Sequence, residues 1–213
     1  PLTFRNLQLL NFPTFQFFNP DSMNLTIISA STRIGRQSHR VALGLAKHFS
    51  QFDDLDVTVA DLAEHSLPLF EEVTVRHPEP TPAMQELGKI LNRSDAFLFV
   101  TPEYNGSYTP ALKNMVDTYN KTEFSRKVIG IVTVTSGGLG GMRAAMQMQQ
   151  LIPALFAIAA PHMLLVPHLA QKFDEEGHLI DEAFRKSLDN FTKEFLWLAQ
   201  ALYEKKAKEL VNV

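Results

Sequence analysis

The fold is decided by the apolar run Ala96-Phe-Leu-Phe-Val100 and the fourteen residues that follow it, Thr101-Pro-Glu-Tyr-Asn-Gly-Ser-Tyr-Thr-Pro-Ala-Leu-Lys-Asn114. An uninterrupted apolar run of this length is typical of a parallel strand that is buried on both faces. Beyond the second proline, apolar residues recur at helical spacing: Leu112, Met115, Val116 and Tyr119. The stretch therefore joins the carboxyl end of a strand to the start of a helix, which is where open α/β sheets bind ligands.

The alternation of apolar strand and amphipathic helix continues on both sides of this stretch. We predict strands at 25–29, 55–60, 96–100, 127–135 and 161–167, and helices that begin near residues 37, 82, 110, 142 and 180. Such alternation predicts an α/β fold, a flavodoxin-like doubly wound five-stranded parallel sheet with strand order 2-1-3-4-5. In that order, the loops after the first, third and fourth strands are neighbours at one edge of the sheet.

The loop after the first strand has the composition of an anion site. It reads Ser31-Thr-Arg-Ile-Gly-Arg-Gln-Ser-His-Arg40, and the segment 24–52 holds four Lys or Arg and no Asp or Glu. Hydroxyls, a helix N-terminus and the charges of Arg33 and Arg36 favour a phosphate. The alternative is that these arginines decorate a solvated turn. The loop matches neither a Walker A sequence nor a Gly-x-Gly-x-x-Gly fingerprint, which disfavours nucleoside triphosphate hydrolysis and simple dinucleotide binding here.

A glycine-rich loop, Ser136-Gly-Gly-Leu-Gly-Gly141, follows the fourth strand. Glycines at a strand end allow positive φ and let the backbone approach a ligand closely, although a merely flexible connection is the competing interpretation. The helix after this loop carries Met142, Met146 and Met148, which we expect to pack in the core, with a contact between subunits as the alternative.

The bulk composition excludes several classes of function. The formal net charge is −3 with acids and bases interspersed, so nothing indicates a nucleic-acid or membrane partner. The absence of cysteine excludes disulfides, thiolate catalysis and cysteine-bound metals. His65 and His77 lack the spacing of a metal site, so we assign no metal. No run is long and apolar enough for a membrane span and no signal peptide opens the chain, so we expect a cytoplasmic protein.

The chain divides into an N-terminal extension, residues 1–22, and a single flavodoxin-like domain, residues 23–213. The extension crowds five phenylalanines between prolines: Phe4, Phe12, Phe15, Phe17 and Phe18. Because Met23 opens directly into a strand, we interpret the extension as introduced by cloning or by an over-long gene prediction. The alternative is an arm that lays its rings on another subunit, since exposed rings would promote aggregation.

Three motifs together resemble the NAD(P)H-dependent FMN reductase family, which includes bacterial quinone, chromate and azo-dye reductases. They are Ser31-x-Arg33-x₄-Ser38-x-Arg40, then Pro102-Glu-Tyr-Asn-Gly-Ser107 with Pro110-Ala-Leu-Lys-Asn114, and Ser136-Gly-Gly-x-Gly-Gly-x-Arg143. The resemblance extends from Met23 to about Val166. The first motif departs from the family at Ala30, where glycine is usual, and at Arg40, where asparagine is frequent.

The resemblance implies an FMN-dependent oxidoreductase that passes hydride from NADPH or NADH through FMN to a small acceptor, such as a quinone, flavin, azo compound or metal oxyanion. Ser31, Arg33, Ser38 and Arg40 would hold the FMN phosphate. The backbone of Glu103, Tyr104 and Asn105, with Pro102 beside it, would meet the isoalloxazine edge, and Ser136, Gly137 and Gly138 would close its pyrimidine side. Because the cofactor carries the chemistry, we assign no catalytic residue of the protein.

The resemblance also implies a homodimer or homotetramer, with the helices after Pro110 and Gly141 at the contact. Two other functions are compatible with the same fold. One is a flavodoxin-like electron carrier, against which the weak net charge argues because such carriers are usually strongly acidic. The other is a non-enzymatic FMN-binding or cofactor-free domain, since fold alone does not fix function.

Overall fold

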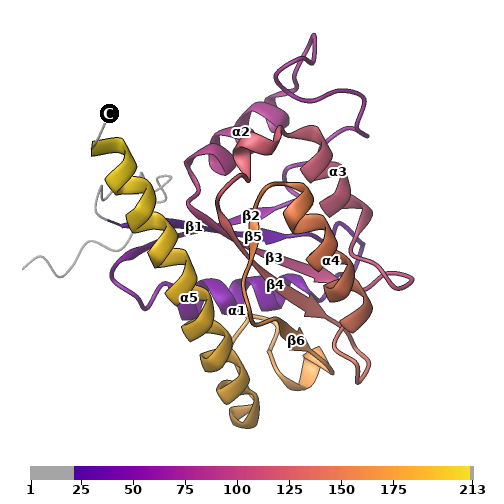
Figure 1. The fold of residues 1–213 in the computed structure, drawn as a ribbon. Helices are drawn as coiled ribbons and strands as arrows, with labels where there is room; N and C mark the ends of the chain where they lie inside the picture. The colour runs from indigo at the N-terminus through magenta and orange to yellow at the C-terminus, as the bar shows by residue number, and fades with distance from the viewer. Residues whose placement is uncertain (1–21, 212–213) are drawn as a thin grey trace, which may run out of the picture.

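A computed structural model describes residues 22–211 of the chain. These residues form three layers, with a central sheet between two layers of helices (Figure 1). The predicted extension lies outside the described residues except for Ser22, which is buried directly before the first strand. No helix among residues 22–211 has both the length and the apolar character needed to cross a bilayer.

The sheet confirms the predicted topology. Its strands run in parallel in the order β2-β1-β3-β4-β5. The first four are β1 (Met23–Ser29), β2 (Leu55–Asp61), β3 (Ala96–Pro102) and β4 (Val128–Val134). As expected for a strand covered on both faces, β4 is buried at every residue and β3 at all but its last.

The fifth strand differs from the prediction. Residues 161–167 were expected to form one strand, but the structure has two short pieces, β5 (Ile158–Ala159) and β6 (Leu164–Val166), which both pair with β4. Residues between them leave the ladder, so the strand starts earlier than predicted and is interrupted. Pro161 lies in this interruption and has no N–H to donate to a neighbouring strand, which accounts for the break.

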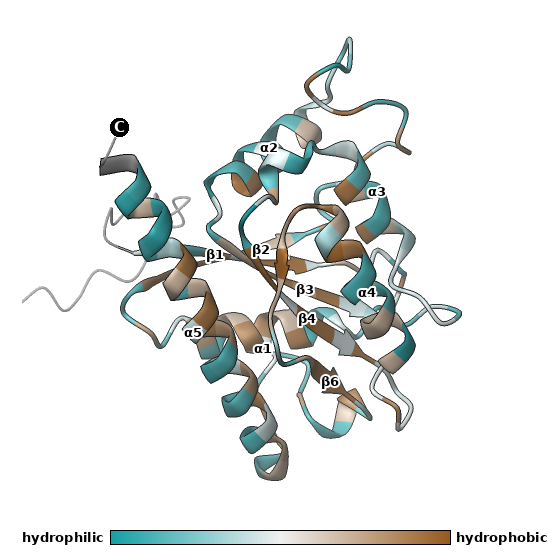
Figure 2. Ribbon diagram, viewed as in Figure 1, coloured by the Kyte–Doolittle hydropathy of each residue, from teal (hydrophilic) through white to brown (hydrophobic). Residues whose placement is uncertain are grey.

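The helices cover the two faces of the sheet, with their hydrophobic sides turned toward it (Figure 2). One face packs against α1 (His39–Phe49) and α5 (Glu182–Val211). The other packs against α2 (Pro82–Arg93), α3 (Pro110–Thr118) and α4 (Met142–Ala154). Each helix begins within about two residues of its predicted start. Two short 3₁₀ segments, η1 (Lys121–Glu123) and η2 (Leu169–Gln171), complete the described chain.

Thr109 fixes the start of α3 against the end of β1. Its hydroxyl accepts a hydrogen bond from the Leu112 N–H at 3.2 Å, which caps the helix, and donates to the carbonyl of Ala30 at 2.7 Å. The Thr109 N–H in turn donates to the Thr101 hydroxyl at 3.1 Å. Buried hydrogen bonds therefore tie the loop after β3 to the last residues of β1, and the relative position of these two loops follows from them.

Lys127 is a buried amine at the opposite end of the sheet. Its Nζ donates to the carbonyls of Leu91 at 2.9 Å and Asn92 at 3.4 Å, at the end of α2, and lies 5.4 Å from the centre of the Phe97 ring. Burial lowers the pKa of Lys127 to about 8, helped by the nearby charge of Lys206. The charged form therefore opposes folding at neutral pH, although it caps the last carbonyls of α2.

We predict that this buried amine makes stability depend on pH in a defined window. The folded-state pKa of Lys127 lies below that of the unfolded chain, so the unfolded state binds more protons between about pH 8 and pH 10.5, and the contribution of Lys127 to stability rises with pH there. The free energy of unfolding of wild type minus that of Lys127→Met should increase by up to about 3 kcal/mol across this window. Urea denaturation at several pH values checks this, and a pH-independent difference contradicts it.

Candidate functional site

Loops from separate strands surround one cavity at the carboxyl edge of the sheet. The cavity has a volume of about 320 Å³. It is lined by the loop after β1, the loop after β3, the end of β4 with the residues that follow it, and Leu169 beyond β6. The structure thus brings together the segments that sequence reasoning placed at the switch point of the sheet.

The candidate residues divide into those that line the cavity and those that do not. The lining includes Ser31, Arg33, Ser38, Pro102, Glu103, Tyr104 and Ser136. Asn105, Gly137 and Gly138 lie in the same loops, outside the lining. Arg40 points elsewhere: its guanidinium donates to the Phe173 carbonyl at 3.4 Å and lies 4.0 Å from the Glu175 carboxylate. Because Arg40 follows the first residue of α1, the turn of the helix directs it away from the loop.

The start of α1 presents a set of donors without acceptors. In the described part of the chain, no acceptor meets the backbone N–H groups of residues 32–35 and 37–39. The Ser38 hydroxyl caps no N–H group of α1 and has no hydrogen-bond partner among these residues, and Ser38 lines the cavity. Hydroxyl and amide donors at a helix N-terminus are the groups that bind a phosphate, so the residues present fit the phosphate of FMN.

The two arginines of this loop differ in their electrostatic state. The guanidinium of Arg36 forms a bidentate ion pair with Asp61, at the end of β2, and donates to the Ser31 carbonyl at 2.8 Å. Burial disfavours the charge of Asp61, but Arg36 and the Ala63 N–H hold the pKa of Asp61 below its usual value. Arg33 is exposed and forms no ion pair within residues 22–211. The expectation that both arginines supply free charge is therefore wrong for Arg36, because a residue far away in sequence neutralises it.

The loop after β3 contains a tight turn and contacts the loop after β1. Tyr104 and Ser107 exchange two backbone hydrogen bonds, at 2.8 and 3.0 Å, across Asn105 with φ 50° and Gly106 with φ 81°. The Tyr104 hydroxyl lies 2.9 Å from the Ser31 hydroxyl. The N–H of Tyr104 is thus used within the turn, and its phenol reaches the phosphate loop, a contact that the sequence did not indicate.

Glu103 connects the loop after β3 to the loop after β4. Its Oε2 accepts from the N–H groups of Arg143 at 3.1 Å and Ala144 at 3.3 Å, in the first turn of α4. The residue before this helix is Gly141, which has no side chain that could cap it. The carboxylate therefore caps a helix that begins about forty residues later in the chain, and holds two walls of the cavity together.

The glycines after β4 have two different roles. Gly140 and Gly141 have φ of 61° and 82°, and a Cβ there would come within 2.8 Å of Leu165 and Thr133, respectively. They are required by backbone conformation and packing. A Cβ on Gly137 would meet no atom within 4 Å. Gly137 therefore leaves open space next to the cavity-lining Ser136, whereas a Cβ on Gly138 would lie 3.5 Å from Nε2 of His168.

A comparison with known protein families identifies the chain. The model of NADPH-dependent FMN reductases matches residues 23–171, more than half of the chain and all of the segments that line the cavity. The chain belongs to the NADPH-dependent FMN reductase family. This result confirms the resemblance noted from the three loop motifs.

Several proteins with similar sequences are named as azoreductases or quinone reductases. The chain is 29% identical to an NADPH azoreductase of Bacillus sp. (strain OY1-2) over 156 residues, 73% of this chain and 83% of the relative. It is 29% identical to a quinone reductase of Pseudomonas putida over 180 residues, 81% and 92% of the two chains. It is 28% identical to an FMN-dependent NADPH-azoreductase of Staphylococcus aureus (strain USA300), over 75% and 86%.

Solved structures share the fold. FerB, a flavoenzyme NAD(P)H:(acceptor) oxidoreductase from Paracoccus denitrificans, superimposes with a TM-score of 0.71 at 21% identity, covering 84% of this chain and 98% of its own. An oxidoreductase from Corynebacterium diphtheriae does so with a TM-score of 0.67 at 18% identity, covering 86% and 98%. At these identities the likeness establishes the flavodoxin-like architecture of this reductase and no more.

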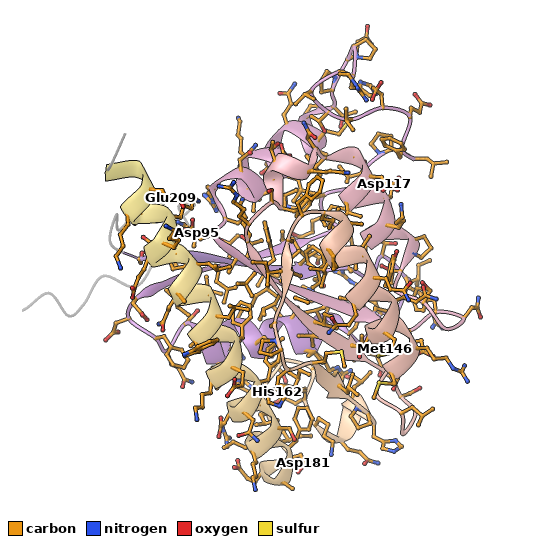
Figure 3. All side chains as sticks on the ribbon, in the orientation of Figure 1. Asp95, Asp117, Met146, His162, Asp181 and Glu209 are labelled. Atoms are coloured by element: carbon orange, nitrogen blue, oxygen red, sulfur yellow. The ribbon has the colours of Figure 1, made fainter. Side chains whose placement is uncertain are left out.

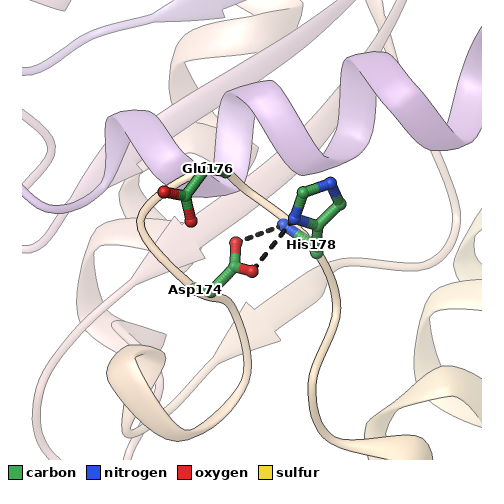
Figure 4. Close-up of side chains that lie close together, drawn as sticks. All are labelled: Asp174, Glu176 and His178. Carbon is green, nitrogen blue, oxygen red and sulfur yellow. Dashed lines mark hydrogen bonds and ion pairs between the residues drawn. The ribbon is translucent and has the colours of Figure 1, made fainter.

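Three potential metal ligands that the sequence analysis did not name lie close together at Asp174, Glu176 and His178 (Figure 4). Both ring nitrogens of His178 are engaged: Nδ1 lies 3.0 Å from Asp174 Oδ2, and Nε2 lies 2.8 Å from Lys47 Nζ. The Asp174 carboxylate also accepts from the His178 N–H at 2.7 Å. An ammonium group in contact with the ring opposes a cation there, so these contacts hold a turn together.

We predict that Glu103→Ala destabilises the fold by about 1 to 2 kcal/mol, because two N–H groups of α4 lose their charged acceptor. Glu103→Gln is the matched control, since its side-chain oxygen can accept the same bonds, and it should recover most of the loss. Guanidinium denaturation of the three proteins measures the effect. Equal stability of the alanine and wild-type proteins would show that the carboxylate does not cap α4.

Proposed function

We propose that this chain is an FMN-dependent oxidoreductase that takes hydride from NAD(P)H and reduces a small acceptor, with a quinone or an azo compound as the first classes to test. The observation that carries the proposal is the cavity in which donors without acceptors at the start of α1 face residues of two further loops. Family membership supports the flavin, and the names of the relatives support the acceptor classes.

The phosphate end of FMN belongs at the loop after β1 in this proposal. Ser38 offers a hydroxyl without a partner, Arg33 an uncompensated charge, and the loop backbone its N–H groups. Ser31 contributes through its hydroxyl, which the Tyr104 phenol orients. Arg40 is left out of this set because its guanidinium contacts Phe173. Arg36 shapes the loop while its charge remains paired with Asp61.

The ring end of FMN belongs between the loops after β3 and β4. Pro102, Glu103 and Tyr104 line one wall and Ser136 lines the other, with the turn at Asn105 and the glycines Gly137 and Gly138 next to them in the same loops. Both walls are stiff, since Glu103 ties them together and the turn is closed by two backbone bonds. Because preformed walls lose less conformational entropy when a ligand binds, their stiffness favours affinity for the flavin ring.

FMN, when bound, supplies the redox chemistry by taking a hydride from the reduced nicotinamide and passing two electrons to the acceptor. The residues of the protein that line the cavity would bind and orient the flavin. No residue is assigned as acid or base. NADPH is the donor named by the family and NADH is the alternative. A requirement for either donor supports a cytoplasmic location.

We expect the purified protein, after incubation with FMN and removal of excess, to show a flavin spectrum that bleaches on anaerobic addition of NADPH. Subsequent addition of a quinone or an azo dye should restore the absorption of the oxidised flavin. Binding without bleaching would instead identify an electron carrier. A protein that stays colourless after reconstitution would support a domain that does not use FMN.

We further propose a homodimer or homotetramer in which α3 and α4 lie at the contact between subunits. The core interpretation of the α4 methionines is correct for Met148, which is buried, but wrong for Met142 and Met146, which are 41% and 52% exposed. Leu139, in the loop before them, is 75% exposed. Figure 3 labels Met146 on this helix. Adjacent exposed apolar side chains favour a surface that another copy covers.

The substitution Met146→Glu should shift the oligomer toward monomer, because a charge would be buried at the contact without a partner. Ser187→Glu adds the same charge on an exposed position of α5 and is the matched control. Light scattering coupled to size exclusion gives the masses. A wild-type protein that is monomeric and fully active would overturn the proposed contact.

A further inference from the structure

His168 lies in the loop after β6 and holds the glycine-rich loop by two hydrogen bonds. Its ring Nδ1 lies 3.1 Å from the carbonyl oxygen of Ser136, and its backbone N–H donates to the carbonyl oxygen of Gly137 at 3.3 Å. A carbonyl can only accept, so Nδ1 must carry the proton in this contact. The Thr135 hydroxyl donates to the same Gly137 carbonyl at 2.9 Å.

These bonds determine where two N–H groups point. In a planar trans peptide, the C=O and the following N–H are directed to opposite sides. Because the carbonyl of Ser136 faces the His168 ring, the N–H of Gly137 faces away from it. Because the carbonyl of Gly137 faces the His168 backbone N–H, the N–H of Gly138 also points away from His168.

Both of these N–H groups lack an acceptor in the described part of the chain. They follow Ser136, which lines the cavity, and a Cβ on Gly137 would meet nothing within 4 Å. Leu169, the neighbour of His168, lines the same cavity and donates its N–H to the Thr135 carbonyl at 3.1 Å. The loop after β6 is therefore part of the cavity wall, and His168 in this loop fixes the position of the glycine backbone through its hydrogen bonds to the Ser136 and Gly137 carbonyls.

We propose that His168 is a positioning residue that presents the N–H groups of Gly137 and Gly138 to the carbonyl oxygens of the flavin pyrimidine ring. This inference rests on the proposed function of the cavity as an FMN site. His168 acts through the glycine backbone, and its contribution concerns the ring of the cofactor and not its phosphate. Sequence reasoning did not select it, because it comes from a loop beyond the last strand.

The backbone conformation of His168 determines which substitutions can test its side chain. Its φ is 46°, in the left-handed region, where asparagine, aspartate and histidine are the enriched residues besides glycine. Asparagine tolerates this conformation and carries an N–H donor near the place of Nδ1–H. Aspartate tolerates it equally but offers only acceptors, and glycine removes the side chain without strain. Substitutions of His168 can therefore remove the side-chain N–H donor, as aspartate and glycine do, or keep one, as asparagine does, while each of them tolerates the left-handed backbone conformation.

The test measures the Kd of FMN and of riboflavin, which lacks the phosphate, by the fluorescence change of the flavin on binding. His168→Gly and His168→Asp should weaken both ligands by a similar factor of about 3 to 10, the effect of one lost hydrogen bond. His168→Asn should bind both close to wild type. Arg33→Ala serves as the opposite comparator and should weaken FMN while leaving riboflavin unchanged. Thermal unfolding of each apoprotein controls for loss of structure.

Each outcome decides the inference. Wild-type affinity for both ligands in His168→Gly overturns it, as does an asparagine variant that binds as weakly as the glycine variant while unfolding at the wild-type temperature. A loss confined to FMN would place His168 at the phosphate and also overturn it. A wild-type protein that binds neither flavin overturns the proposed function itself, which distinguishes that failure from the others.

Discussion

The pairing of β1 with β3 is the interaction on which the site depends. The two strands run in parallel from Leu25 opposite Ala96 to Ser29 opposite Val100, and the Ala30 N–H extends the ladder to the Val100 carbonyl. Beyond this point the chain after β1 turns to α1 on one face of the sheet, and the chain after β3 turns to α3 on the other. A crevice must open where two neighbouring strands send their connections to opposite faces. Thr109 prevents the crevice from spreading, because its hydroxyl bridges the start of α3 to Ala30.

The walls of the cavity are joined by side chains that reach from one loop to the next. Tyr104 contacts Ser31, Glu103 caps α4, and His168 holds the carbonyls behind the glycines. These contacts use side chains of the loops, while several backbone N–H groups of the same loops have no acceptor in the described part of the chain. A ligand that offers a phosphate and ring carbonyls can accept hydrogen bonds from such donors. The arrangement fits the proposed FMN site, in which no charged residue has a catalytic role.

Asp61 shows how the fold distributes charge. The segment 24–52 contains no acid, and both Arg33 and Arg36 were expected to be available to an anion. Parallel pairing places Asp61 of β2 beside Ser29 of β1, so that its carboxylate meets Arg36 directly after the strand. Arg36 therefore stabilises the loop through its ion pair with Asp61, whereas the charge of Arg33 is not paired within residues 22–211. The distinction depends on strand register, which residue type and spacing along one segment do not specify.

The sequence by itself determined the sheet order, the starts of the helices and the three loop motifs, because apolar periodicity and loop composition are local properties that survive any packing. It did not determine the interruption at Pro161, the exposure of Met142 and Met146, or the direction of Arg40. Nor did it reveal Asp61 or His168 as partners within the site, or the hydrogen bonds by which the Glu103 side chain caps α4. These depend on which segments, distant in the chain, the tertiary structure brings within hydrogen-bond distance, and only the packing of loops from separate strands at one edge of the sheet decides that.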